Sequence, residues 1–153
     1  MKLGFKVVDV SDAEGGLRRL GSELGEQRLV DATVSGATIL VNRWKNTVSY
    51  VTGEYKRSIR EKVTRRSPGN VQVTVGTDLV NPPYPWVLEY GKTIHAKNAP
   101  YLHFKTKDGN WVKVKSVTIP PKGWARRAFD ESQDEVGQEI ADALGDLIDR
   151  EWR

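Results

Sequence analysis

A stripe of apolar residues in the first third of the chain constrains its fold more than any other feature. Apolar side chains recur there at alternating spacings of four and three residues: Val30, Val34, Ala37, Val41, Trp44, Val48 and Val51. These spacings place the side chains on one side of an α-helix. Leucines at positions 17, 20 and 24 continue the stripe slightly out of phase, so we predict a long helix over residues 12–51.

Local signals mark the limits of this predicted helix. Ser11 or Asp12 is placed to cap its start, and Gly36 is where we expect any bend. Gly53 is placed to end the helix in a left-handed conformation. Such a helix would span about 60 Å at 1.5 Å per residue. A compact domain of 153 residues does not need that length, so we expect part of the helix to pack on something else.

Two strands are predicted after the helix, over residues 57–64 and 71–77. In the second segment valine alternates with polar residues, which is the pattern of a half-buried strand. Pro68 and Gly69 predict the loop between the two strands. Prolines at positions 82, 83 and 85 exclude a regular sheet there. We therefore predict an irregular segment that leads to residues 86–91.

Residues 101–117 predict a β-hairpin whose turn contains Asp108 and Gly109. A two-residue loop would pair Phe104 with Lys113 and mix polar and apolar faces. A three-residue loop over 107–109 pairs Phe104 with Val112 instead, and it puts Gly109 where a left-handed bulge needs it. We therefore predict the three-residue loop. One face then carries Leu102, Phe104, Val112 and Val114, and the other carries Tyr101, His103, Lys105, Trp111, Lys113 and Lys115.

Pro120 and Pro121 end the last strand, and a second helix is predicted over residues 123–152. Its apolar stripe is Phe129, Val136, Ile140, Leu144, Leu147 and Ile148. The predicted fold class is α+β, with a long N-terminal helix, an antiparallel sheet of about four strands with a prominent hairpin, and a C-terminal helix. We predict one domain over residues 1–153.

Charge is divided unevenly along the chain. Residues 52–127 contain 15 basic and 5 acidic residues, whereas residues 128–153 contain 2 basic and 9 acidic residues. The basic middle is compatible with nucleic-acid binding. Alternatively, the two regions complement each other within one subunit or between subunits, or they are two ordinary solvated faces.

Composition excludes several classes of site. The chain has no cysteine, so it has no disulfide or thiolate metal site, and this fits folding in a reducing cytosol. The N-terminal residues lack the apolar run of a signal peptide, and no segment approaches the roughly 20 apolar residues that span a bilayer. We therefore expect no membrane contact.

A search for catalytic motifs gives little. Neither a nucleophile motif nor a phosphate-binding loop is present. The only histidines, His95 and His103, lack further ligands of matching type nearby in the sequence. Glu89 and Asp108 are the one carboxylate pair to consider, but aspartate in a turn is explained by local hydrogen bonding. We expect no catalytic residue, no metal and no cofactor.

The polar face of the predicted hairpin is the best candidate for a binding surface. Lysines alternate there with Tyr101, His103 and Trp111. Such a face can hold single-stranded nucleic acid by stacking and charge. It can equally be a protein interface, where tryptophan, tyrosine and long amphipathic side chains are favoured. We favour the protein interface because no recognised nucleic-acid motif accompanies the patch.

The order of several short motifs resembles that of the neck and tail-completion proteins of tailed bacteriophages. The motifs are TGEYKRSI at 52–59, LEYG at 88–91, KNAPYLHF at 97–104, WVKVK at 111–115, IPP at 119–121 and RRAFDES at 126–132. In that family they follow the long helix, form the hairpin and its exit, and begin the last helix. The resemblance extends over residues 14–150 and rests on the order and spacing of the motifs.

This resemblance implies a structural subunit of the head–tail joining region and not an enzyme. Such subunits form a homo-oligomeric ring, here expected to be a hexamer, between head-closure proteins and the tail terminator. The chain would then be a virion protein that assembles in the host cytoplasm, with contact to DNA in the lumen left open. The alternative is a small basic nucleic-acid-binding protein, and a hydrolase using Glu89 or Asp108 is a third reading. The predicted interface residues are Tyr101, His103, Lys105, Trp111, Lys113, Lys115, Glu135, Glu139 and Asp142.

Overall fold

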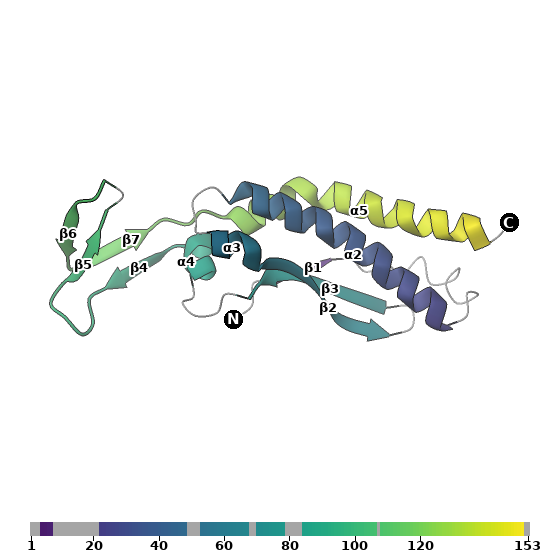
Figure 1. Ribbon diagram of the computed structural model, residues 1–153, viewed down its shortest axis with the longest axis horizontal. Coiled ribbons are helices and arrows are strands. Elements are labelled where there is room, and N and C mark those ends of the chain that lie inside the picture. The colour runs from purple at the N-terminus through teal and green to yellow at the C-terminus, as the bar shows by residue number, and fades with distance from the viewer. Residues whose placement is uncertain are drawn as a thin grey trace. The chain divides into compact units, whose positions relative to one another are not determined.

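The computed structural model describes residues 4–7, 22–48, 53–67, 70–78, 84–106 and 108–151. Helices and strands are mixed, with a long N-terminal helix, antiparallel strands and a C-terminal helix, which confirms the predicted α+β class (Figure 1). The chain divides into two compact units: Met1–Val80 with Trp124–Arg153, called the core unit here, and Asn81–Gly123, called the ribbon unit. The predicted single domain stays a prediction.

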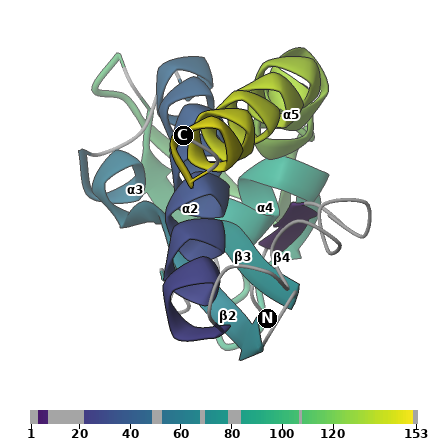
Figure 2. The same cartoon turned by 90° about the vertical axis from the view of Figure 1, so that its right-hand side faces the viewer.

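The core unit is built in three layers. Helix α2 (Ser22–Thr47) contacts helix α5 (Trp124–Glu151) on one side and strands β2 (Ile59–Ser67) and β3 (Asn70–Thr77) on the other. Strand β1 (Gly4–Val7) completes an antiparallel sheet in the order β1-β3-β2. Figure 2 shows α2 between α5 and the sheet.

Its place in the middle layer explains why α2 buries more than one stripe. Val30, Ala37, Val41, Trp44 and Val48 of the predicted stripe are buried, whereas Val34 is half-buried. A second set on the same helix is also buried: Leu29, Ala32, Thr33, Gly36 and Leu40. A helix that is covered from two sides needs apolar or small residues around most of its circumference.

The predicted end of the first helix is wrong. Helix α2 ends at Thr47, and Gly53 begins the short helix α3 (Gly53–Ser58). Residues 47–52 are all poor helix formers by intrinsic propensity. The short helix α3 places Tyr55 in the core, where its ring centroid lies 6.4 Å from that of Trp124. The predicted start at residue 11 or 12, and Val51, lie outside the described residues.

Gly36 lies where α2 packs closely against α5. A Cβ atom at this position would lie 2.6 Å from Cγ1 of Ile140, which is far inside van der Waals contact. Helix α2 is continuous through Gly36. The glycine is therefore explained by close helix packing, and the expected bend is not needed to account for it.

The two predicted strands after the helix are confirmed with shifted limits, because Arg57 and Ser58 belong to α3. In β3, Val71, Val73 and Val75 are buried, as their alternation indicated. Strand β2 pairs with β3 in an antiparallel register that shifts between Val63 and Arg65, which marks a bulge. We did not predict β1, which pairs with the other edge of β3.

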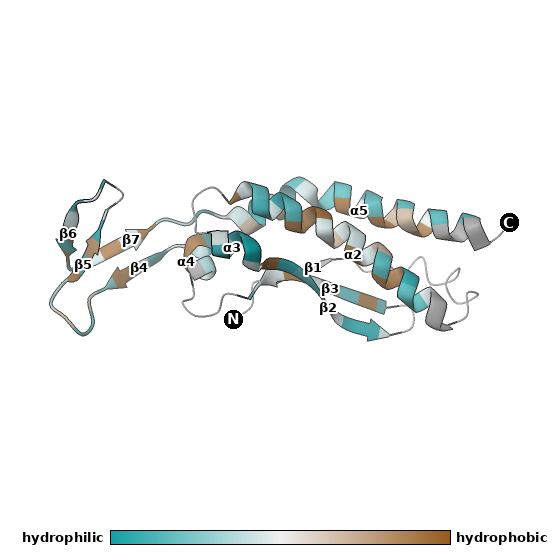
Figure 3. Ribbon diagram, in the orientation of Figure 1, coloured by the Kyte–Doolittle hydropathy of each residue, from teal (hydrophilic) through white to brown (hydrophobic). Residues whose placement is uncertain are grey.

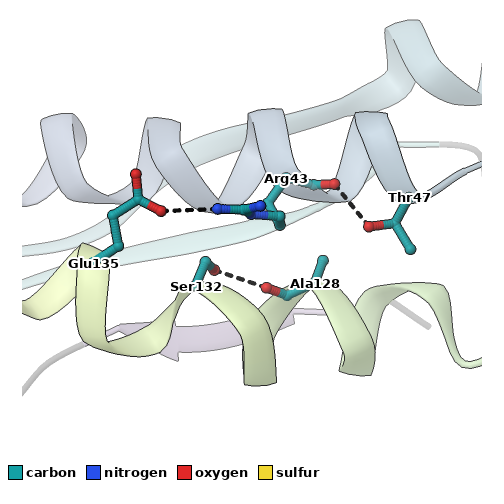
Figure 4. A network of polar contacts seen from close by, with 5 residues as sticks. All are labelled: Arg43, Thr47, Ala128, Ser132 and Glu135. Carbon is teal, nitrogen blue, oxygen red and sulfur yellow. Dashed lines mark hydrogen bonds and ion pairs between the residues drawn. The ribbon is translucent and has the colours of Figure 1, made fainter.

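Helix α5 agrees closely with its predicted range of 123–152. Val136, Ile140 and Leu144 of its predicted stripe are buried, and so are the small residues Ala125, Ala128 and Ser132. Figure 4 shows how polar groups between the helices are satisfied. The Ser132 hydroxyl donates to the Ala128 carbonyl at 2.7 Å, and Arg43 of α2 contacts Glu135 of α5 at 3.0 Å.

Candidate functional site

The ribbon unit is held at its base by the last turn of helix α4 (Tyr84–Tyr90). Gly91 follows with φ of 73°, and its N–H donates to the Val87 carbonyl at 2.9 Å. A side chain is strained at this φ, and a Cβ atom here would lie 2.8 Å from Cδ of Pro121. Lys122 N–H donates to the Leu88 carbonyl at 2.7 Å. The carbonyl end of α4 therefore binds both the segment that enters the following strands, at Gly91, and the segment that leaves them, at Lys122.

Two strand pairs form what we call the ribbon, residues 92–119 (Figure 1). Strand β4 (Lys92–His95) pairs with β7 (Ser116–Ile119), and β5 (Leu102–Lys105) pairs with β6 (Trp111–Val114). Between them the Ala96 N–H donates to the Lys115 carbonyl at 3.1 Å. Strands β6 and β7 are thus one run of chain that bends at Lys115.

The predicted hairpin register is confirmed. Phe104 pairs with Val112 and Leu102 with Val114, and the Thr106 N–H donates to the Asn110 carbonyl at 2.8 Å. Gly109 has φ of 83°, as the left-handed position of a three-residue loop requires. Sorting the side chains by face was therefore sufficient to find the register.

One face of the hairpin brings four of the predicted interface residues into contact. The His103 and Trp111 ring centroids lie 4.7 Å apart, and Nζ of Lys113 lies 5.0 Å from the centre of the Tyr101 ring. The last contact has the geometry of a cation–π pair. Lys105 is paired with Trp111 across the strands. We call this set the cationic–aromatic face: Tyr101, His103, Lys105, Trp111 and Lys113.

This face is open to solvent. The exposed fraction is 66% for Trp111 and 40% for Tyr101. Lys115, the sixth predicted residue, is exposed at the bend between β6 and β7. Large aromatic side chains at such exposure are typical of surfaces that a partner covers.

The opposite face of the hairpin is apolar but also uncovered. Leu102, Val112 and Val114 are half-buried, and Phe104 is 36% exposed. On the adjoining strand pair, Ile94 faces Val117 and is 37% exposed. Figure 3 shows apolar residues, in brown, on both β4 and β7. None of the described side chains between Gly91 and Gly123 is buried.

The three acidic interface residues that we predicted on the last helix differ in their contacts, although their spacing places them on one side of α5. Glu135 forms an ion pair with Arg43, and Glu139 accepts a hydrogen bond from the Ser35 hydroxyl, so both lie on the flank of α5 that faces α2. Asp142 is exposed and accepts a hydrogen bond from Gln138 of its own helix at 2.7 Å. Of these three, Asp142 is the one whose hydrogen bond stays within its own helix.

The residues considered for catalysis are dispersed within the ribbon unit. His95 is exposed on β4, and His103 packs against Trp111. Glu89 is buried in α4, whereas Asp108 is exposed in the hairpin turn. Across the described parts of the chain, no three histidine, aspartate or glutamate side chains gather as a metal site would require.

A polar depression lies over the sheet of the core unit. It is lined by Arg60, Glu61, Lys62, Thr64, Thr74, Gly76, Thr77 and Asp78. Arg60 and Asp78 form an ion pair across it, and the Thr64 and Thr74 hydroxyls lie 3.1 Å apart. Two of its four charged side chains, Arg60 and Asp78, therefore already partner each other.

Strand β4 and its pairing with β7 were missed in the sequence. A weak signal was present, because Thr93 and Thr118 are both strand-forming residues, and their hydroxyls lie 3.0 Å apart across the ladder. The short segment 92–95 has no alternation long enough to predict a strand by itself.

Of the helices that the structure describes, none combines the length and the apolar character that crossing a membrane would take. Comparisons with protein-family models, with curated proteins and with solved structures found no match to this chain. The likeness to phage neck and tail-completion proteins accordingly stays a prediction from the sequence motifs.

Proposed function

We propose that this chain is a structural subunit of the junction between the head and the tail of a tailed bacteriophage. In this role it assembles as a ring, expected to be a hexamer, between the head-closure proteins and the tail terminator, and it performs no catalysis. The motif order quoted above supplies the phage assignment. The α+β architecture agrees with what that resemblance implies for the fold.

The observation that carries a structural role is the ribbon, which has no core of its own. A two-stranded ribbon is at best marginally stable in water. Here both faces expose large apolar side chains, among them Trp111, Tyr101 and Phe104. A surface of this kind gains stability when a partner covers it, as in an assembled particle.

The proposal is tested in the phage genome that encodes the chain. An early stop codon in the gene should yield filled heads and separate tails in electron micrographs of the lysate. Supplying the intact chain from a plasmid should restore joined, infectious particles. Normal joined particles from the stop-codon phage would rule the proposal out.

The second candidate function, nucleic-acid binding, is favoured by one specific observation. Lys113 and Tyr101 are already in contact on the cationic–aromatic face, and His103 packs on Trp111. A single-stranded oligonucleotide could stack there. A protein that makes several phosphate contacts loses on the order of 10³-fold in affinity between 50 and 200 mM salt. Oligonucleotide binding with this salt dependence would support the second function.

A further inference from the structure

We propose that the cationic–aromatic face of the ribbon docks on the outer face of helix α5 in a second copy of the chain. This inference rests on the proposed function in one respect, because it needs neighbouring copies in an assembly. The partner of the ribbon is then helix α5 of the neighbouring copy, which the motif resemblance does not specify.

The outer side of helix α5 is acidic over most of its length. Residues 128–149 contain eight acidic residues and no lysine or arginine. A row at four-residue spacing is exposed throughout and contains four of these eight acidic residues, with Gln138 in the middle: Asp130, Asp134, Gln138, Asp142 and Asp146. Like charges four residues apart destabilise a helix. The row therefore costs the isolated subunit stability, and a basic partner would remove that cost.

A flank of small residues runs beside the acidic row. Gly137, Ala141 and Gly145 are exposed, and a Cβ atom at either glycine would meet no atom within 4 Å. Glycine inside a helix is unfavourable relative to alanine. At Gly36 close packing on Ile140 explains the glycine, but within the described structure nothing explains the two on α5. A flat flank of this kind lets an aromatic ring approach the helix closely.

The ribbon unit has the complementary charge and spacing. Residues 81–123 contain seven basic and two acidic residues, and one of the acidic residues, Glu89, is buried. Residues four apart on a helix repeat every ~6 Å. Diagonal neighbours across an antiparallel pair lie about 7–8 Å apart, so Lys105 and Lys113 come close to the spacing of neighbouring aspartates on α5.

The contact uses two different surfaces of each subunit. One copy supplies its ribbon and the next supplies its helix, so the arrangement is head-to-tail and repeats from copy to copy. Charge sets the orientation of such a contact more than its strength. The strength comes from burying Trp111 and Tyr101, which are the large exposed side chains of the face.

Two charge-reversal variants of the full chain test this contact. The first carries Lys105→Glu and Lys113→Glu on the ribbon, and the second carries Asp134→Lys and Asp142→Lys on α5. The first then has two acidic surfaces and the second has two basic ones. A matched control carries Lys56→Glu and Lys62→Glu, which reverse two exposed lysines of the core unit. Self-association is measured by sedimentation at low salt.

The wild-type chain should self-associate, and each variant alone should lose on the order of tenfold or more in association constant. An equimolar mixture of the two variants should recover association, because every ribbon then meets a helix of opposite charge. The lysine control should behave as the wild type. Mixing distinguishes contacts between copies from contacts within one chain, which mixing cannot restore.

Gly137→Leu provides a test that is independent of charge. Space is open at this position, so the variant should fold, but it should associate more weakly than Gly137→Ala. A wild-type chain that stays monomeric, a mixture that associates no better than its components, or Gly137→Leu that associates as Gly137→Ala does would overturn the inference. Oligonucleotide binding without self-association would overturn it too. Unjoined heads in the stop-codon phage alongside any of these results would leave the proposed function standing.

Discussion

The core unit and the ribbon unit use the same residue types in opposite ways. Trp44 of the core unit is fully buried in α2, whereas Trp111 of the ribbon is 66% exposed. Valines in β3 are buried, whereas Val112 and Val114 in β6 are only half-buried. The core unit is thus stabilised by burial within one chain. The ribbon is ordered by its backbone ladder, and its side chains stay exposed or half-buried.

Replacing Trp44 and Trp111 with alanine, one at a time, should give the largest difference in stability between the two units. Trp44→Ala should lower the free energy of unfolding by about 3–5 kcal/mol, because it removes a large buried side chain and leaves a cavity. Trp111→Ala should change it by less than about 0.5 kcal/mol, since an exposed side chain is lost. Chemical denaturation followed by circular dichroism measures both. Equal losses would show that the ribbon is part of the folding core.

Alanine substitutions at the buried Gly36 and at the exposed Gly137 should give the next largest difference in the free energy of unfolding. Gly36→Ala should cost about 1–3 kcal/mol, because its Cβ would overlap Ile140 in a close-packed interface. Gly137→Ala should instead raise the free energy of unfolding by about 0.5–1 kcal/mol, through helix propensity alone. Thermal unfolding of the two variants against wild type decides the matter. Stabilisation by Gly36→Ala would mean that α2 and α5 are not in close contact there.

The sequence was informative where a pattern is fixed by local geometry. Only one loop length puts Phe104 opposite Val112, so the hairpin register followed from face sorting. The valine alternation in β3 and the apolar stripe of α5 were informative for the same reason. In each case the spacing of the apolar residues is set by the geometry of a single helix or strand, one face of which is buried.

The sequence was uninformative where a residue's role depends on a distant partner. Helix α2 has a second buried side because both α5 and the sheet cover it. The spacing of apolar residues within α2 does not indicate which elements will pack against it. Gly36 predicts a bend when only the sequence is considered, because Ile140, which accounts for the glycine, is more than a hundred residues away in the chain. Similarly, Glu135 and Glu139 were predicted as interface residues, and only the fold shows their contacts with α2.

The smallest expected effect concerns charge inside the core unit, at the ion pair of Arg43 and Glu135 (Figure 4). Both side chains are about half exposed, at 43% and 56%, so solvent screens their attraction. A double-mutant cycle with Arg43→Met and Glu135→Gln should give a coupling of about 0–1 kcal/mol that falls as salt is added. Denaturation of the wild type, the two single variants and the double variant at low and high salt provides the measurement. A coupling well above this range and insensitive to salt would mean that charge holds α2 to α5. A weak, screened coupling would leave apolar burial as the force between these helices. Any effect of the charge-reversal variants on self-association would then come from surfaces outside the α2–α5 interface.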